Sequence, residues 1–375
     1  MAYIYIFLFS LSILLVYIGY KTRTKGFDNL KVFRVVENNR IVEGESFKIT
    51  TVIENNKYLP ISFLAISEKI PYGITYSGEK LDFKDGNSLW HISKYSIRWF
   101  ERRRRTYTLI GVNRGTYLIK DMNITIGDIF GFSVHTKEVE DFIEVLVYPK
   151  LIPIKKYVFD TTNFNGDNTV KRWIHKDPLY IKGIREYNVE DKMKDIHWKS
   201  SLKMNKLMVK DYDYTSERQL ILILNIQCHK DHWSHIKKDV IENGVRIIGS
   251  LAYKAIKEGI PTGIWTNGRI ISYSDNFPSE VSPEINSFKK IMEICARVDY
   301  TIKTEFNEYL QSNLRRFERN CTYVVVTPYL DNESRVILSK IKNNGFNVKM
   351  IDISDDNSIN PIEGIEKLSF KGVNR

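Results

Sequence analysis

The sequence has few cysteines and lacks the short motifs that mark common enzyme classes. Among its 375 residues the cysteines are Cys228, Cys295 and Cys321, and no two of them form a Cys-x-x-Cys pair. An odd number of widely spaced cysteines excludes a disulfide framework and is typical of a reducing compartment. The sequence also contains no nucleophile elbow, phosphate-binding glycine loop, His-Glu-x-x-His helix or dinucleotide fingerprint. These absences count against the common hydrolases, nucleotide-binding proteins and zinc proteases.

Charged side chains are missing from residues 1–20, which form a strongly apolar stretch. About 20 residues at a helical rise of ~1.5 Å span a hydrocarbon core of roughly 30 Å. A cleaved signal peptide would have a basic start, a shorter apolar run and a small-residue cleavage site, and none of these is present. We therefore expect a single transmembrane helix over residues 1–20 of a cell-membrane protein. The basic juxtamembrane linker that follows, residues 21–31, places the bulk of the chain in the cytoplasm.

The rest of the chain is basic overall, which is compatible with an acidic partner. The formal net charge is +11 and the pI is about 9.2. The densest cluster is Arg102 to Arg105, which would suit phosphate groups of anionic lipid or nucleic acid. Charges of this kind also protect a hairpin tip or an edge strand from pairing with other chains. We prefer the structural explanation and keep anionic lipid or nucleic-acid binding through Arg102–Arg105 as an alternative.

Residues 32–150 have the pattern of a small antiparallel β-sandwich. Phe47, Ile49, Thr51 and Ile53 alternate with Lys48, Thr50, Val52 and Glu54, which is the period of a half-buried strand. Similar short strands are expected at residues 95–100, 106–112, 116–119, 123–126 and 143–148. Residues 151–182 are polar and irregular, and we interpret them as a connection.

From residue 219 the pattern changes to strands that alternate with helices. The run at residues 219–226 is continuously apolar, as in a strand covered on both faces. Further strands are expected at residues 260–266, 322–327 and 346–351, and helices at 234–258, 283–297, 305–319 and 334–343. This alternation predicts a parallel, doubly wound α/β sheet. The whole chain is thus of the multi-domain α+β class, and its last domain covers residues 183–375.

Residues 183–213 lie where these two patterns meet and combine aromatic side chains with charges of both signs. Arg185 and Asp191 are candidates for a catalytic pair, but we expect an ion pair that braces the segment. Tyr187 and Trp198 are expected to pack beneath that ion pair. We interpret the segment as a binding surface, whose residues are Gly183, Arg185, Tyr187, Asp191, Trp198, Ser200 and Lys210.

The same segment carries the motifs of the family called domain of unknown function 58. Its pattern is close to G-x-R-x-Y-x-x-G-D, then I-x-W-x-x-S-A-R, then L-x-V-K, and the matching residues are Gly183, Arg185, Tyr187, Asp191, Ile196, Trp198, Ser200, Leu207, Val209 and Lys210. Residues 114–117, 128–132 and 147–149 resemble the family's β-domain motifs. The sequence departs from the pattern at Glu190, which replaces a glycine, and at residues 201–203.

This resemblance implies a membrane-anchored protein whose C-terminal domain is like a von Willebrand factor type A domain. Members often accompany MoxR-type AAA+ ATPases, so an ATPase of this kind is a candidate partner. Type A domains bind a divalent cation through Asp-x-Ser-x-Ser at the end of their first strand. The aligned residues here are Asn225, Gln227 and His229, which lack the carboxylate and both hydroxyls. We therefore expect a degenerate site, with no metal and no cofactor.

A separate cluster at residues 228–235 contains transition-metal ligands. Cys228, His229, Asp231, His232 and His235 could in principle hold Zn²⁺ and serve a metal-dependent hydrolase, although their spacing matches no established zinc pattern. The preferred prediction is a non-enzymatic, membrane-anchored cytoplasmic scaffold or adaptor with a protein partner. The hydrolase that uses the Cys228–His235 cluster and the anionic lipid binder remain alternatives, and nucleic acid is not an expected partner.

Overall fold

The protein is represented by a computed structural model of the 375-residue chain, and the described residues fall into two compact units. The structure describes residues 2–77, 83–85, 88–120, 122–127, 134–152, 157–159, 181–188, 191, 193–212, 219–231, 235–273 and 277–373. The first unit comprises residues 1–150 and 271–275, and the second comprises residues 151–270 and 276–375.

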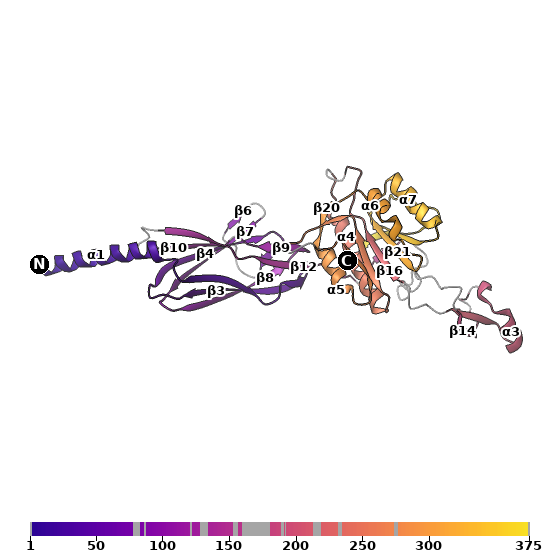
Figure 1. Ribbon diagram of the computed structural model, residues 1–375, viewed down its shortest axis with the longest axis horizontal. Coiled ribbons are helices and arrows are strands. Elements are labelled where there is room, and N and C mark those ends of the chain that lie inside the picture. Colours follow the sequence, from indigo (N-terminus) through magenta and orange to yellow (C-terminus); the bar gives the residue numbers. More distant parts are fainter. Residues whose placement is uncertain are drawn as a thin grey trace. The chain divides into compact units, whose positions relative to one another are not determined.

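The first unit begins with helix α1 (Ala2–Lys25), which is the apolar helix expected from the sequence (Figure 1). Its segment Tyr3–Lys21 has a mean hydropathy of 2.0, so it is long and apolar enough to cross a membrane. The helix does not end with the apolar stretch at residue 20. It continues through the first residues of the basic linker to Lys25, because the residues from 20 to 25 include no proline or glycine and Gly26 follows them.

Three sheets form the β domain of the first unit (Figure 1). Their orders are β1-β3-β8-β5, β11-β10-β4-β7-β6 and β2-β12-β9, and all pairs are antiparallel except β2 with β12. The strands are β1 (Leu30–Val36), β2 (Arg40–Val42), β3 (Ser46–Asn55), β4 (Ile61–Pro71), β5 (Ile74–Tyr76), β6 (Phe83–Asp85), β7 (Ser88–Ile97), β8 (Arg102–Gly111), β9 (Gly115–Ile119), β10 (Met122–Gly127), β11 (Val134–Val139) and β12 (Ile143–Tyr148). Alternation in β3 was a reliable signal, since Phe47 and Ile49 are buried and Lys48 is exposed.

A layer of buried polar side chains separates two apolar clusters in this domain. The layer contains Arg34 on β1, Thr51 on β3 and Glu68 on β4. On each strand the polar residue lies between an apolar residue of one cluster and an apolar residue of the other. The Glu68 carboxylate accepts hydrogen bonds from Tyr107 Oη at 2.9 Å and from Thr51 Oγ1 at 3.3 Å. Arg34 donates to Asp141 at 3.0 Å and lies 3.9 Å from Glu68. Because this layer is buried, it places ionisable groups in the centre of the fold.

The second unit is built on a seven-stranded sheet in the order β13-β23-β22-β21-β16-β17-β19. Its strands are β13 (Tyr157–Phe159), β16 (Gln219–Leu224), β17 (Thr262–Thr266), β19 (Glu280–Glu284), β21 (Cys321–Thr327), β22 (Asn347–Asp352) and β23 (Glu366–Val373). Helices α4 (Lys238–Lys257) and α5 (Phe288–Arg297) cover one face, and α6 (Phe306–Asn313) and α7 (Asn332–Asn343) cover the other. Because both faces are covered, β16 and β21 are the continuous apolar runs seen in the sequence.

The sheet is not entirely parallel, which corrects the expectation. The interior strand pairs are parallel, but β19 pairs antiparallel with β17 and β13 pairs antiparallel with β23. Two expected boundaries change with it. The helix expected from residue 283 begins at Phe288, because Pro283 lies within β19. The strand at residues 346–351 is not the last one, since β23 follows it.

Two small elements complete the second unit. β18 (Gly268–Ile270) pairs with β20 (Val298–Ile302). β14 (Ile181–Glu186) and β15 (Met208–Tyr212) form a hairpin whose connection holds a 3-10 turn, Met193–Asp195, and the short helix α3 (Trp198–Met204). We call residues 181–212 the signature segment, because the family motifs lie within it.

Candidate functional site

An ion pair fixes the connection of the signature segment. Arg185 on β14 donates to both carboxylate oxygens of Asp191, at 2.7 and 2.5 Å. The same carboxylate accepts the backbone N–H of Asn188 at 2.8 Å. A bidentate guanidinium–carboxylate contact sets orientation as well as distance. The pair is thus a structural brace, and the geometry gives no sign that it is a catalytic pair.

Helix α3 is short but is held at both ends and on its inner side. His197 caps the first turn, because its Nδ1 accepts the backbone N–H of Ser200 at 3.1 Å. Asn205 ends the helix in the left-handed conformation, with φ of 52°. Ser201 is buried, and its hydroxyl accepts the backbone N–H of Met208 at 2.8 Å. These contacts join α3 to β15.

α3 exposes large apolar side chains beside the exposed lysines Lys199 and Lys203. Trp198 is 62% exposed and Leu202 is 83% exposed, four residues apart on one side of the helix. Met193 and Met204 are exposed in the same segment. The expectation that Trp198 packs beneath the Arg185–Asp191 pair is therefore wrong. An inward serine with outward tryptophan and leucine reverses the usual pattern of a surface helix, and such exposed apolar faces mark interaction sites.

The remaining signature residues have smaller structural roles. Tyr187 is half-buried, and its backbone N–H donates to Leu207 O at 2.9 Å. Lys210 lies opposite Ile184 in the hairpin. A Cβ added at Gly183 would meet no atom within 4 Å, so neither close packing nor a positive φ explains a glycine at that position. Glu190 and residues 128–132 lie outside the described part of the chain.

The carboxyl end of β16 is the position at which type A domains hold a cation, and here it carries a network of amides. Asn225 Nδ2 donates to Thr327 Oγ1 at 2.9 Å and to Tyr329 O at 3.0 Å. Asn225 Oδ1 accepts from Asn267 Nδ2 and from the backbone N–H of Gln227, both at 2.9 Å. The Asn225 N–H₂ group thus points at the oxygens of Thr327 and Tyr329. The Asn225 side-chain oxygen, which could otherwise bind an ion, already accepts two hydrogen bonds.

Gln227 and His229 extend the same pattern. Gln227 Oε1 accepts the backbone N–H of Phe306, the first residue of α6, at 2.9 Å. His229 Nδ1 accepts the backbone N–H of Asp231 at 3.1 Å. Their acceptor atoms are therefore directed at the protein backbone. The residues present do not fit a divalent cation, and in the described ranges no three His, Cys, Asp or Glu side chains group as metal ligands.

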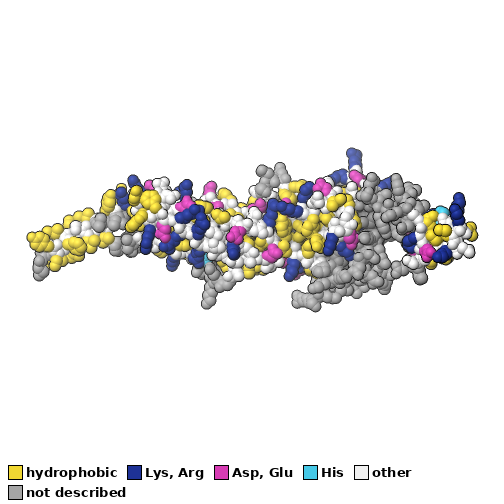
Figure 2. Space-filling model, turned by 90° about the horizontal axis from the view of Figure 1, so that it is seen from below, with side chains coloured by type: hydrophobic (Ala, Val, Ile, Leu, Met, Phe, Trp, Pro, Cys, Tyr) yellow, Lys and Arg dark blue, Asp and Glu magenta, His cyan; other side chains and the backbone are white. Residues whose placement is uncertain are grey.

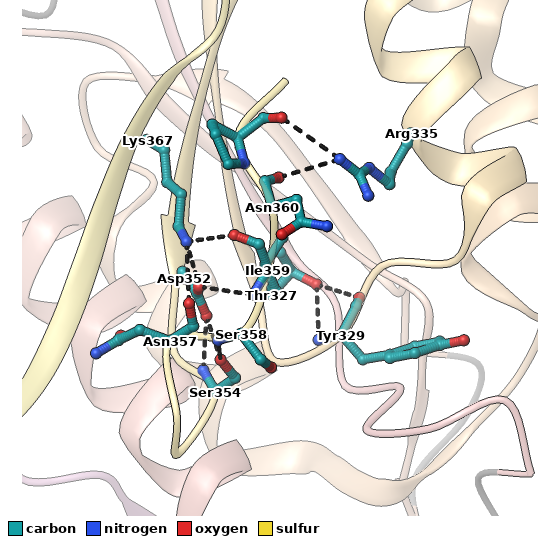
Figure 3. Close-up of polar contacts among 11 residues, drawn as sticks. Thr327, Tyr329, Arg335, Asp352, Ser354, Asn357, Ser358, Ile359, Asn360 and Lys367 are labelled. Atoms are coloured by element: carbon teal, nitrogen blue, oxygen red, sulfur yellow. Dashed lines mark hydrogen bonds and ion pairs between the residues drawn. The ribbon is translucent and has the colours of Figure 1, made fainter. Parts of the chain in front are cut away.

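A buried carboxylate at the end of β22, which is separated from β16 by β21, is also neutralised from within the chain (Figure 3). Asp352 is fully buried, and Lys367 Nζ on β23 lies 2.8 Å from its Oδ2. Its Oδ1 accepts from the backbone N–H of Ser354 at 2.9 Å and from the Ser354 hydroxyl at 2.6 Å. Lys367 also donates to the carbonyl oxygens of Asn357 and Ile359. The lysine ammonium thus provides the positive charge that a metal ion would otherwise supply.

The Cys228–His235 cluster is brought together only in part. The rings of His229 and His235 lie 4.5 Å apart, and the His229 ring lies 6.0 Å from that of Tyr329. Cys228 is half-buried, and this burial raises the pKa of its thiol. A raised pKa disfavours the thiolate that binds metal. His232 lies outside the described residues.

The four arginines Arg102 to Arg105 form the first half of β8 and have different surroundings. Arg102 pairs with Glu54 at 2.9 Å, and Arg103 pairs with Glu101 at 2.7 Å. Arg105 reaches inward, where Nη1 donates to Ser93 Oγ at 3.0 Å. β5 pairs with β8 only from Leu109 onward. The arginines therefore lie on the part of β8 that β5 does not cover, as the edge-strand explanation predicts.

Sequence reasoning missed several contributors to these sites. Leu202, Met193 and Met204 were not selected, although the four-residue spacing of Trp198 and Leu202 on either side of Ser201 was a readable signal. Asn267 and Thr327 belong to the amide network but come from other strand ends. No local pattern marks them, because the network forms only when the sheet is assembled.

Comparison with known proteins supports the family resemblance over the second half of the chain. Residues 183–361 match the family described as "Protein of unknown function DUF58". A curated relative, the uncharacterized protein YeaD of Bacillus subtilis (strain 168), is 21% identical over 237 residues, which cover 63% of this chain and 55% of that protein. The chain thus spans about half the length of this relative.

Several solved structures are similar to a smaller part of the chain. The CARDB domain of the PF1109 protein from Pyrococcus furiosus is 14% identical with a TM-score of 0.22, over 32% of this chain and 94% of that one. A cohesin module from a Clostridium perfringens family 33 glycoside hydrolase is 13% identical with a TM-score of 0.23, over 32% of this chain and 98% of that one. Similarity at these scores carries no argument about fold or function.

Proposed function

We propose that this chain is a DUF58 protein that works as a membrane-anchored, non-enzymatic scaffold, with the bulk of the chain in the cytoplasm. The observation that carries the proposal is the exposed apolar face of α3, formed by Trp198 and Leu202 on a firmly braced segment. A large aromatic and a leucine presented together on a preorganised helix have the properties of a binding hot spot. The partner is a protein, and a MoxR-type AAA+ ATPase is the candidate that the family resemblance supplies.

The second unit is proposed to be a type A-like domain. Its sheet contains β19-β17-β16-β21-β22-β23 with one antiparallel strand, β19, at the end of that series. That order and the helices on both faces support the proposal. The cation site of such a domain is proposed to be replaced by the Asn225 amide network and the Asp352–Lys367 pair. A partner that binds at this sheet edge is then expected to bind without a divalent metal ion.

The test is recovery of the partner from native membranes with variants of the exposed face. We expect the wild-type chain to co-purify a protein in near-stoichiometric amount, and Trp198→Ser/Leu202→Ser to lose at least about tenfold of it, as for loss of a hot spot. Val336→Ser is the matched control, because Val336 is an exposed apolar residue on α7 in the same unit. Recovery that is unchanged by the double substitution, or equally reduced by Val336→Ser, would contradict the proposal.

A further inference from the structure

Three aromatic side chains project from two turns at one end of the β domain of the first unit. Tyr58 is 84% exposed, Trp99 is 60% exposed and Phe100 is 56% exposed. The rings of Tyr58 and Phe100 meet edge to face at a centroid distance of 4.7 Å. We call these three residues the aromatic tip. A cluster of large exposed aromatics is uncommon on a surface that faces only water.

The turn that carries Tyr58 is hydrogen-bonded to the residues that directly follow α1. Lys57 Nζ donates to the carbonyl oxygens of Gly26 and Asp28, and the backbone N–H of Asn56 donates to Asn29 O at 2.9 Å. Phe100 N–H in turn donates to Lys57 O at 3.3 Å, which connects the second turn to the first. Both turns therefore lie next to the segment by which the chain leaves α1.

The two turns are held rigidly by a buried asparagine. Asn55 is fully buried, and its Nδ2 donates to Leu59 O at 3.0 Å and to Arg98 O at 2.8 Å. Glu101 accepts the backbone N–H of Arg98 at 2.6 Å. Phe100 itself has φ of 51°, in the left-handed region that glycine or asparagine would adopt more easily. A bulky aromatic is thus kept outward in a conformation that its own backbone disfavours.

Basic side chains surround the aromatic tip. The cations at this end are Lys57, Arg98, Arg102, Arg103 and Arg104, and the carboxylates among them are Asp28, Glu54 and Glu101. The excess is positive, and Lys25 at the end of α1 adds to it. In Figure 2 the Lys and Arg side chains (dark blue) begin where the hydrophobic surface of α1 ends. Tryptophan and tyrosine are enriched at membrane interfaces, and basic groups there attract anionic headgroups.

We infer that the aromatic tip contacts an anionic bilayer surface, with Tyr58, Trp99 and Phe100 at headgroup depth and the surrounding arginines on lipid phosphates. The inference rests on the proposed anchoring of the chain by α1. It goes further in that the β domain is fixed against the membrane at a second point. It also gives a binding role to two exposed arginines, Arg98 in the turn before β8 and Arg104 on β8.

Lipid-proximity NMR on the full chain tests this contact. The six tryptophans are replaced by 5-fluorotryptophan, and the Trp99 resonance is assigned by its loss in Trp99→Phe. The chain is reconstituted in phosphatidylcholine–phosphatidylglycerol vesicles with a lipid that carries a spin label near the headgroup. We expect the Trp99 line to broaden roughly three-fold or more relative to the lines of Trp198, which is exposed, and Trp265, which is buried.

The charge requirement is tested with Arg98→Gln/Arg104→Gln. We expect less broadening of the Trp99 line than in the wild type when phosphatidylglycerol is present, and no difference in phosphatidylcholine alone. Lys340→Gln/Lys342→Gln on α7 is the matched control and should behave as the wild type.

The failures of the two proposals are distinguishable. A chain that resists carbonate extraction while its Trp99 line stays as narrow as that of Trp265 would overturn the lipid contact and leave the anchor intact. Release of the chain by carbonate would overturn the anchor, and the contact with it. A Trp99 shift with a single-stranded oligonucleotide but not with vesicles would assign the tip to nucleic acid and overturn the lipid contact.

Discussion

At the scale of single residues, Glu68 is the group with the clearest physical consequence. It is a buried carboxyl in the polar layer of the β domain, and burial raises its pKa above the usual 4.5. Arg34 and the hydrogen bonds from Tyr107 and Thr51 oppose that rise, whereas nearby Asp141 adds to it. The protonated form is therefore the one that the fold favours.

This predicts a pH dependence of stability that Glu68→Gln removes. A carboxyl whose pKa is raised in the folded state contributes its full stabilisation of the folded state below pH 4.5. That contribution is lost as the pH rises through the folded-state pKa. Each unit of difference between the folded-state and unfolded-state pKa changes the free energy of unfolding by about 1.4 kcal/mol. Hydrogen exchange of β3 and β8 should show wild-type protection falling over this window and a flatter profile in Glu68→Gln. Glu138→Gln, at an exposed site on β11, should keep the wild-type slope.

The amide network at the carboxyl end of β16 is built from donors and acceptors that satisfy one another. Asn225 keeps the outline of an aspartate but offers an N–H donor to Thr327 and Tyr329, where a metal ligand would offer an oxygen to the ion. The sequence alone predicts a degenerate site, because Asn225, Gln227 and His229 offer no carboxylate and no hydroxyl, and this stays a prediction. It could not predict that Asn267 would complete the network, since Asn267 and Asn225 meet only when β17 lies beside β16.

At the scale of elements, two residues of the signature segment have different roles: Arg185 is structural, and Trp198 is proposed to bind the partner. Arg185 braces the connection through a partly exposed bidentate pair, whereas Trp198 on α3 is exposed. Replacing Arg185 with alanine should cost about 1 kcal/mol locally and speed amide exchange of α3 roughly five-fold. Trp198→Ser should leave α3 exchange unchanged and lose the partner. Equal exchange effects in the two variants would show that Trp198 is also structural.

Local pattern predicted several strands, but it missed the interior strand β4 and placed at residues 95–100 a strand, β7, that ends at Ile97. Alternation identified β3, and continuous apolar runs identified β16 and β21, because burial imposes those patterns directly. β13, β19 and β23 were also missed. β13 and β19 are the edge strands of their sheet and are covered on fewer sides, and Pro283 in β19 is a residue that usually argues against a strand. The aromatic tip was missed for a different reason: Tyr58 and Trp99 are distant in sequence, and buried Asn55 brings their turns together.

At the scale of the whole molecule, the remaining question is how the chain meets the membrane. α1 contains Tyr3–Lys21, whose composition suits a hydrocarbon core, and basic residues follow it on the C-terminal side only. If the proposed anchoring by α1 holds, the positive-inside rule predicts that the residues after α1 lie in the cytoplasm. The cysteine content is consistent with that side, since Cys228, Cys295 and Cys321 are all free thiols in the structure.

The corresponding prediction concerns protease access in membranes of defined orientation. In inside-out vesicles, added protease should degrade the chain to a short fragment that contains α1, whereas right-side-out vesicles should protect it.

The chain should also stay in the pellet after carbonate extraction, because burial of about 20 apolar residues in the bilayer holds a spanning helix there. Moving the positive charge by Lys21→Gln/Arg23→Gln/Lys25→Gln, with lysines added before residue 3, should reverse the protection pattern. Protection in inside-out vesicles for the wild type would contradict the assigned topology, and release by carbonate would contradict the anchor itself.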